Sequence, residues 1–156
     1  MIKRKYLFSI LYRTIRFSVK LLVSFFQFIS GQKKDLESIV EFGDSNLIRI
    51  NKYFGSFAYS FPIPKDIAIE VYDLNFKSPL LAASFKSEKD LIDIWLKLGL
   101  GGAVFKTIMS EKRNGNIRPR LQQVRLERQA CLVNALGLPG EGVELFSNSI
   151  IDSPLW

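Results

Sequence analysis

The sequence contains almost none of the residues that bind zinc or form disulfides. Its 156 residues include no histidine and a single cysteine, Cys131. One cysteine excludes an internal disulfide, so nothing indicates a small disulfide-stabilised secreted protein. Because zinc sites are usually built from His and Cys ligands, a zinc site of that type is excluded as well. We predict no metal site.

Basic residues are not in excess beyond the N-terminal segment. The net charge is +7, but residues 1–34 hold eight basic and no acidic residues, and the remaining 122 hold 14 basic and 15 acidic. A nucleic-acid interface on four clustered arginines is an alternative (Arg118, Arg120, Arg125 and Arg128). Glu127 lies among them and no aromatic side chain interleaves, so we predict no nucleic-acid partner. Hydrophobic residues make up 47% and charged residues 24%, which is typical of a globular protein.

Long hydrophobic runs are missing from the N-terminal segment, although it is rich in apolar residues. Its longest charge-free stretch is Leu21–Gln32, well short of the roughly 20 residues that span a bilayer. Arg13, Arg16 and Lys20 follow one stripe of a helix. Residues 1–31 are therefore predicted to form an amphipathic helix on a membrane surface, which implies association with the cytoplasmic face of the membrane.

Two other interpretations of this segment remain open. It can be a helix that packs on its own domain or on a partner subunit, which leaves a cytoplasmic protein. It can also be a secretory signal, although no convincing small-residue cleavage site follows the apolar run.

Residues 32–65 form a helical connecting region. Apolar spacing predicts a short helix around 36–42 and a further one over 47–57. The prolines of "FPIPK" (61–65) interrupt helix and central strand alike, because proline lacks a donor N–H.

Residues 66–156 show an α/β pattern. We expect a hairpin (67–71 with 74–76), a buried strand over 80–84, and a helix that begins with a capping box at Ser87 and ends at Gly99. A strand over 103–107, a long polar loop, the apolar pair 132–133 and a helix from about Gly142 follow. Strand–helix–strand with short turns predicts a βαβ unit, and hence a parallel sheet or barrel.

Polar residues follow each predicted strand of this unit. They are Ser84, the pair Lys106-Thr107, and Asn134. In parallel α/β folds, functional groups gather at the carboxyl ends of the strands. A buried ammonium is costly without an anionic partner, and its position favours a ligand over a salt bridge for Lys106. Purely structural roles also remain open, because Thr107 can be an ordinary strand residue and Asn134 a turn residue.

Three segments resemble the dihydroorotate dehydrogenases, which are FMN-dependent (β/α)8 barrels of pyrimidine biosynthesis. They are "FKSPLLAAS" (76–84), "GAVFKTIMSEKRNGNIRPRL" (102–121) and "LVNALGLPGEGVELF" (132–146). Their order and spacing agree with the family over roughly 70 residues, from 77 to 146. The resemblance implies that residues 66–156 are the N-terminal portion of a TIM barrel, preceded by the basic, apolar helical arm.

The resemblance also implies roles for individual residues. Lys106 would contact both FMN and the dihydroorotate or orotate, Thr107 would hydrogen-bond FMN, and the small residues Ala83 and Ser84 would pack beside the flavin ring. Asn134 would hydrogen-bond the substrate. Three further residues, Leu136, Gly137 and Leu138, would present backbone beside it.

The class of dehydrogenase is indicated by two features that point in different directions. The motif around Lys106 is similar to class 1, and Ser87 and Glu88 occupy the positions of the class 2 Asp-Lys pair. The apolar basic arm is similar to class 2, the membrane-associated group that reduces quinone. The family's glycine after the small pair is matched by Phe85, which departs from the pattern.

The length of the chain predicts an incomplete barrel. A (β/α)8 barrel takes about 250 residues, so the catalytic base and the phosphate site are expected outside this chain, and no catalytic residue is assigned within it. We expect the chain to be inactive alone, and a missing barrel half or a homo-oligomer would complete it. The alternative is a non-catalytic, membrane-associated remnant of the barrel.

Overall fold

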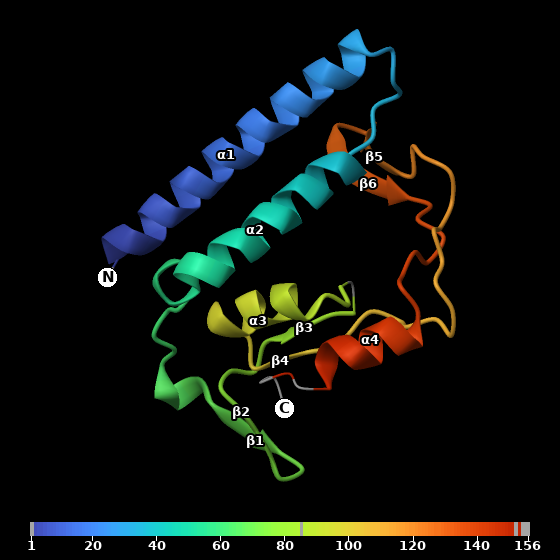
Figure 1. Cartoon of the computed structure of the whole chain (residues 1–156). Coiled ribbons are helices and arrows are strands. Elements are labelled where there is room, and N and C mark those ends of the chain that lie inside the picture. Colours follow the sequence, from blue (N-terminus) through green and yellow to red (C-terminus); the bar gives the residue numbers. More distant parts are fainter. Residues whose placement is uncertain (1, 85, 152, 154–156) are drawn as a thin grey trace. The chain divides into compact units, whose positions relative to one another are not determined.

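The computed structural model describes residues 2–84, 86–151 and 153, which form two compact units. Unit 1 combines Met1–Gly43 with Asn116–Leu136, and unit 2 combines Asp44–Gly115 with Gly137–Trp156. Figure 1 shows the elements along the chain. Each unit therefore brings together two stretches that are distant in sequence.

Unit 1 begins with the long helix α1 (Ile2–Ile29). The stretch contains neither proline nor glycine, and the helix is followed by Gly31 in the left-handed region, at φ 63°. Helix α2 (Glu37–Ala58) follows, and Asp35 prepares its start because its Oδ1 accepts a hydrogen bond from the Glu37 N–H at 3.0 Å. Within the described part of the chain, no helix has the length and apolar character required to cross a bilayer.

The two helices expected between residues 32 and 65 are one helix, α2, with a kink at Phe54. The first turns of α2 belong to unit 1 and the rest, from Asp44, to unit 2. Residues 43–46, between the two apolar stretches, are glycine, aspartate, serine and asparagine, which all have low helical propensity. Helical propensity is a weak preference, and it does not by itself decide where a helix ends.

Unit 1 also contains an antiparallel hairpin, β5 (Leu121–Leu126) and β6 (Gln129–Asn134). The polar loop predicted before residue 132 was wrong, because this part of the chain forms β5 and the start of β6. The turn consists of Glu127 and Arg128, which both have positive φ. Such two-residue turns usually carry Gly, Asn or Asp, so Glu127 and Arg128 are not residues from which a turn is predicted.

Unit 2 contains the predicted βαβ unit, but its two strands are shorter than expected, and the first is not the buried strand predicted over 80–84, because Leu80 and Leu81 are exposed. Strands β3 (Leu81–Ala82) and β4 (Gly102–Ala103) are parallel, and helix α3 (Lys89–Lys97) joins them. The predicted hairpin is also present, as β1 (Ile69–Val71) and β2 (Leu74–Phe76) after a 3-10 turn at Lys65–Ile67. Helix α4 (Val143–Ile150) starts after Gly142, as expected. Among the described residues each sheet has two strands, so the barrel is not closed within this chain.

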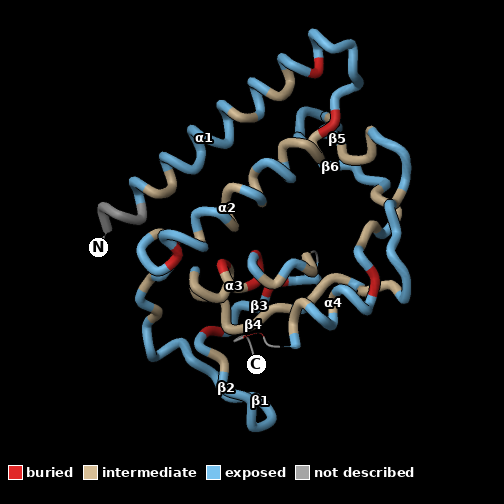
Figure 2. The backbone as a smooth tube through the Cα atoms, viewed as in Figure 1, coloured by how far each residue is buried: buried red, intermediate tan, exposed pale blue. Residues whose placement is uncertain are grey.

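The core of unit 2 lies under α3. Leu91, Ile92 and Ile94 of this helix are buried, together with Ala82 of β3; Figure 2 marks these positions in red. The helix ends where Gly99 turns to φ 113°. Its N-cap is Glu88 without a side-chain cap hydrogen bond, so the capping box predicted at Ser87 is not formed.

Candidate functional site

The carboxyl ends of β3 and β4 lie side by side and carry four of the predicted site residues, Ala83, Ser84, Lys106 and Thr107. Beyond the regular strands, the Val104 N–H donates to the Ala82 carbonyl at 3.0 Å. The Ser84 Oγ then donates to the Phe105 carbonyl at 2.9 Å, and the Lys106 N–H donates to the Lys86 carbonyl at 2.8 Å. The parallel pairing therefore continues past the strands and fixes these residues at one edge.

The ammonium of Lys106 is held by a neutral group. Its Nζ donates to the Pro139 carbonyl oxygen at 2.8 Å, and the side chain is half-buried. Among the ion pairs of the described residues, none involves Lys106. A carbonyl carries only a partial charge, so the positive charge of Lys106 remains available to an anionic ligand.

The turn before Pro139 contains two more predicted site residues. Gly137 and Leu138 have φ of 73° and 54°, and this left-handed backbone presents the Pro139 carbonyl to Lys106. Leucine rarely adopts such a φ, so surrounding contacts must enforce it. The Arg113 and Gly140 backbones provide them through two mutual hydrogen bonds of 2.8 and 2.9 Å.

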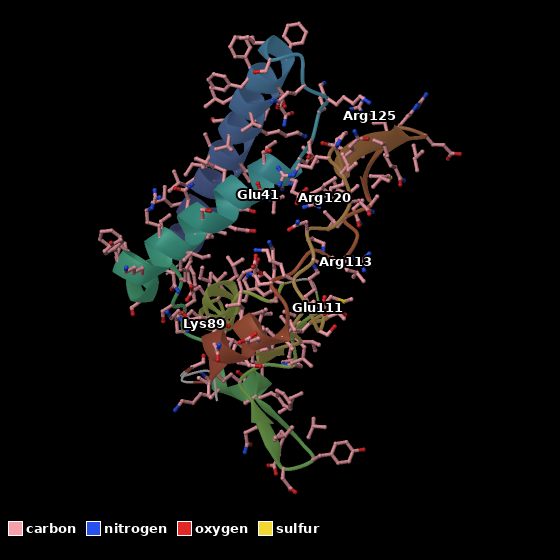
Figure 3. All side chains as sticks on the ribbon, turned by 45° about the vertical axis from the view of Figure 1, so that its right-hand side comes forward. Glu41, Lys89, Glu111, Arg113, Arg120 and Arg125 are labelled. Carbon is pink, nitrogen blue, oxygen red and sulfur yellow. The ribbon has the colours of Figure 1, made fainter. Side chains whose placement is uncertain are left out.

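The loop 110–113, where Figure 3 labels Glu111 and Arg113, also packs closely on Gly142. A Cβ on Gly142 would lie 2.9 Å from the backbone of both Glu111 and Lys112, so only glycine fits this contact. The Phe105 and Phe146 rings meet edge to face, 5.2 Å apart, and dock α4 beside the end of β4.

Asn134 and Leu136 belong to unit 1, whereas the other predicted site residues belong to unit 2. Asn134 was expected to follow a third parallel strand, but it ends the antiparallel strand β6, opposite Leu121. Its side chain is exposed. Phe85, the expected departure from the family pattern, lies outside the described residues.

Sequence reasoning missed Lys86, whose carbonyl accepts the Lys106 N–H. Its Nζ pairs with the carboxylate of Asp44 on α2, and both side chains are largely buried, at 18% and 25% exposed. The two residues are 42 positions apart, and one sequence contains no local signal that joins them.

The arginines of residues 118–120 form an ion-pair network in unit 1. Arg120 donates from Nε and Nη2 to the two carboxylate oxygens of Glu37, both at 2.7 Å, and Arg118 pairs with Glu41. Figure 3 shows Arg120 and Glu41. The hydrogen bond from Arg120 is the main cause that lowers the pKa of Glu37.

Unit 1 also contains an open groove of about 430 Å³, lined by α1, the α1–α2 link and β5. Lys20 and Gln27 line it from α1, and Lys34 and Arg125 contribute further cations. Lys20 donates a hydrogen bond across it to Gln123. In the described residues we find no cluster of His, Cys, Asp or Glu that could hold a metal ion.

The fold and the strand-end site define an α/β protein with a parallel strand pair that presents a lysine. The dihydroorotate dehydrogenase family model matches residues 66–153, more than half of the chain. The chain belongs to this family.

Quinone-type dihydroorotate dehydrogenases are similar to the same part of the chain. The protein of Rhodopseudomonas palustris (strain ATCC BAA-98 / CGA009) is 37% identical over 87 residues, which are 54% of this chain and 23% of that protein. The protein of Bradyrhizobium sp. (strain BTAi1 / ATCC BAA-1182) is 36% identical over 87 residues, with the same coverage. The chain thus spans about a quarter of the length of the curated relatives it matches.

Solved structures agree in fold. The DHODH of Eimeria tenella in complex with ferulenol superimposes with a TM-score of 0.58 at 17% identity, covering 75% of this chain and 30% of that one. The ligand-free type DHODH from the same organism superimposes with a TM-score of 0.53 at 18% identity, covering 70% of this chain and 30% of that one.

Proposed function

We propose that the chain is the N-terminal part of an FMN-dependent oxidoreductase that oxidises dihydroorotate to orotate. In this proposal, residues 1–31 associate with a membrane and residues 66–156 contribute the first portion of a TIM barrel. Residues 32–65 form the helical region that connects the two. The observation that supports it best is the uncompensated ammonium of Lys106 beside small residues at two parallel strand ends.

The residues at the strand ends fit a flavin and a small acid. Ala83 and Ser84 are exposed and small, which lets a planar ring approach the backbone. Bound FMN would supply the acceptor for the two electrons that leave the substrate. Lys106 would bind and orient the substrate carboxylate and balance negative charge near the ring. Its Pro139 contact holds the ammonium in place for this role.

The remaining assignments extend this site. Thr107 would hydrogen-bond FMN, Asn134 the substrate, and the backbone of 136–138 would line the substrate pocket. The base that removes the substrate proton is expected outside this chain, so the chain alone would bind without turning over. A missing barrel half or a second copy would complete the site.

A flavin titration tests this function. We expect the full chain to quench FMN fluorescence on binding, and Lys106→Met to weaken binding of FMN or of added orotate by roughly tenfold, the value of one charge-assisted hydrogen bond. Lys112→Met is the matched control, because Lys112 forms an exposed surface pair with Glu141. Equal binding by both variants would remove Lys106 from the site.

The alternative is a non-catalytic remnant that keeps the strand ends and the membrane arm. The phenylalanine at position 85, where the family pattern has a glycine, favours it. It predicts no FMN or orotate binding by the wild-type chain, even after mixing with a polypeptide that supplies the rest of the barrel.

The membrane assignment is supported by α1, which appears mostly pale blue in Figure 2. Its exposed apolar side chains are Tyr6, Leu7, Ile10, Leu11, Tyr12, Ile15, Phe17, Leu21, Leu22, Phe25, Phe26, Phe28 and Ile29. Such a surface is unfavourable in water and inserts into the interface of a bilayer. On that membrane a quinone would be the acceptor that reoxidises the flavin, and the cytoplasmic face is the proposed location.

Vesicle co-sedimentation tests the arm. We expect Phe28→Ser to weaken binding to vesicles by roughly thirtyfold, since a phenylalanine side chain contributes about 2 kcal/mol when buried. The control is Ile117→Ser, which removes an exposed apolar residue of unit 1 outside α1. Similar losses in the two variants would argue against the arm as the membrane anchor.

A further inference from the structure

Lys86 connects the strand-end site to α2. The residue lies in the link between β3 and α3, two positions after Ser84. Its backbone carbonyl accepts the Lys106 N–H at 2.8 Å, and its ammonium pairs with Asp44. One residue therefore contacts the site through its backbone and a separate helix through its side chain.

The helix that Lys86 contacts is itself fixed within unit 2. Asn51 of α2 donates from Nδ2 to Asp93 Oδ2 of α3 at 2.8 Å, and Lys97 of α3 donates back to Asn51 Oδ1 at 3.0 Å. Gly55 allows this close approach, because a Cβ there would lie 2.4 Å from Asn51 Oδ1. Asp44 is thus presented by a helix that cannot easily shift along α3.

We propose that Lys86 is a positioning residue that anchors the strand ends carrying Ser84 and Lys106 to α2. The anchor itself follows from the contacts of unit 2, and its consequence for flavin binding rests on the proposed function. The side chain acts through Asp44 and the backbone through Lys106, so loss of the charge should loosen the site without touching it.

Hydrogen exchange measured by mass spectrometry on the full chain tests the anchor. We expect Lys86→Met to raise exchange in peptides covering 80–88 and 103–107 by about fivefold, as loss of a partly buried ion pair implies. Asp44→Asn should have the same effect, and the exchanged pair Asp44→Lys with Lys86→Asp should restore protection. The control is Lys89→Met, which removes a lysine at the start of α3 that joins none of the ion pairs among the described residues.

If the double variant with swapped charges restores protection, the effect comes from a specific ion pair. A general loss of stability would not be repaired by swapping the two charges. The proposal would be overturned if these peptides exchanged hydrogen in Lys86→Met at the same rate as in the wild type. It would also be overturned if combining Asp44→Lys with Lys86→Asp did not restore protection. If Lys86→Met does not fold, as judged by circular dichroism, Lys86→Arg is compared with Asp44→Asn. The arginine variant must then keep protection while the asparagine variant loses it.

A further readout connects the anchor to function. FMN affinity should fall about fivefold in Lys86→Met and recover when Asp44→Lys and Lys86→Asp are combined. A wild type that does not bind FMN refutes the proposed function. Hydrogen exchange measured without FMN still decides whether Lys86 is an anchor.

Discussion

The pair between Glu37 and Arg120 allows a quantitative prediction for unit 1. Two charge-assisted hydrogen bonds of 2.7 Å join the side chains, which are only 12% and 10% exposed. Each such bond contributes about 1.5–3 kcal/mol, but desolvation offsets part of it. Glu37→Gln keeps the shape and one carbonyl acceptor, so we expect a loss of about 2 kcal/mol, or roughly 30-fold in the local opening equilibrium.

The assay is hydrogen exchange of the hairpin peptides 121–134, combined with a double-mutant cycle. The cycle compares Glu37→Gln, Arg120→Met and the double variant, and isolates the coupling between the two side chains. We expect a coupling of about 2 kcal/mol. Glu41→Gln is the matched control, because Glu41 is 56% exposed and its pair with Arg118 should contribute less than about 1 kcal/mol.

A coupling below about 0.5 kcal/mol would contradict the reasoning. It would mean that desolvation cancels the two hydrogen bonds, and that other contacts, such as the hydrogen bond from the Leu36 N–H to the Leu121 carbonyl, hold the hairpin to the start of α2. A loss of stability in Glu41→Gln as large as that in Glu37→Gln would also contradict the reasoning, because the buried ion pair should stabilise unit 1 more than the exposed one.

Two other outcomes follow from single residues. The pKa of Glu37 is lowered from its ordinary 4.5, chiefly by the Arg120 hydrogen bond. The stabilisation by the Glu37 carboxylate is therefore complete above about pH 4.5 and is lost as the pH falls through the lower pKa of the folded state. Acid unfolding of Glu37→Gln should lack this pH-dependent loss of stability. Gly101→Ala would put a Cβ 2.0 Å from the Ser78 carbonyl oxygen and should cost about 3 kcal/mol in thermal denaturation, whereas Gly140→Ala, with open space, should be nearly neutral.

Local pattern was sufficient for the helical arm and the βαβ unit. The stretch up to Ile29 lacks proline and glycine, and Gly99 terminates α3 where the apolar spacing ends. These signals act within a few residues, since backbone conformation and one-sided burial depend on near neighbours. The resemblance to the family depended on similar short segments and was confirmed by the family match over residues 66–153.

The hairpin and the single helix α2 could not be obtained in this way. The β5–β6 turn uses Glu127 and Arg128 in a conformation that sequence preferences assign to other residues. Its ends are held by contacts with the start of α2, more than 80 positions away, including the Leu36 N–H to the Leu121 carbonyl at 2.9 Å. Asn134 was therefore assigned to the wrong kind of strand, and its role at the substrate stays a prediction.

The sequence alone determined that a lysine follows a strand at the carboxyl edge of a βαβ unit, because periodicity and glycine stops are local properties of the chain. Only the tertiary structure decided what that lysine meets. Its partner is the carbonyl of Pro139, 33 residues further on, and its backbone is held by Lys86, which reaches Asp44 42 positions earlier. Such partners are chosen by burial and geometry across the folded unit, so they leave no trace in the neighbouring residues.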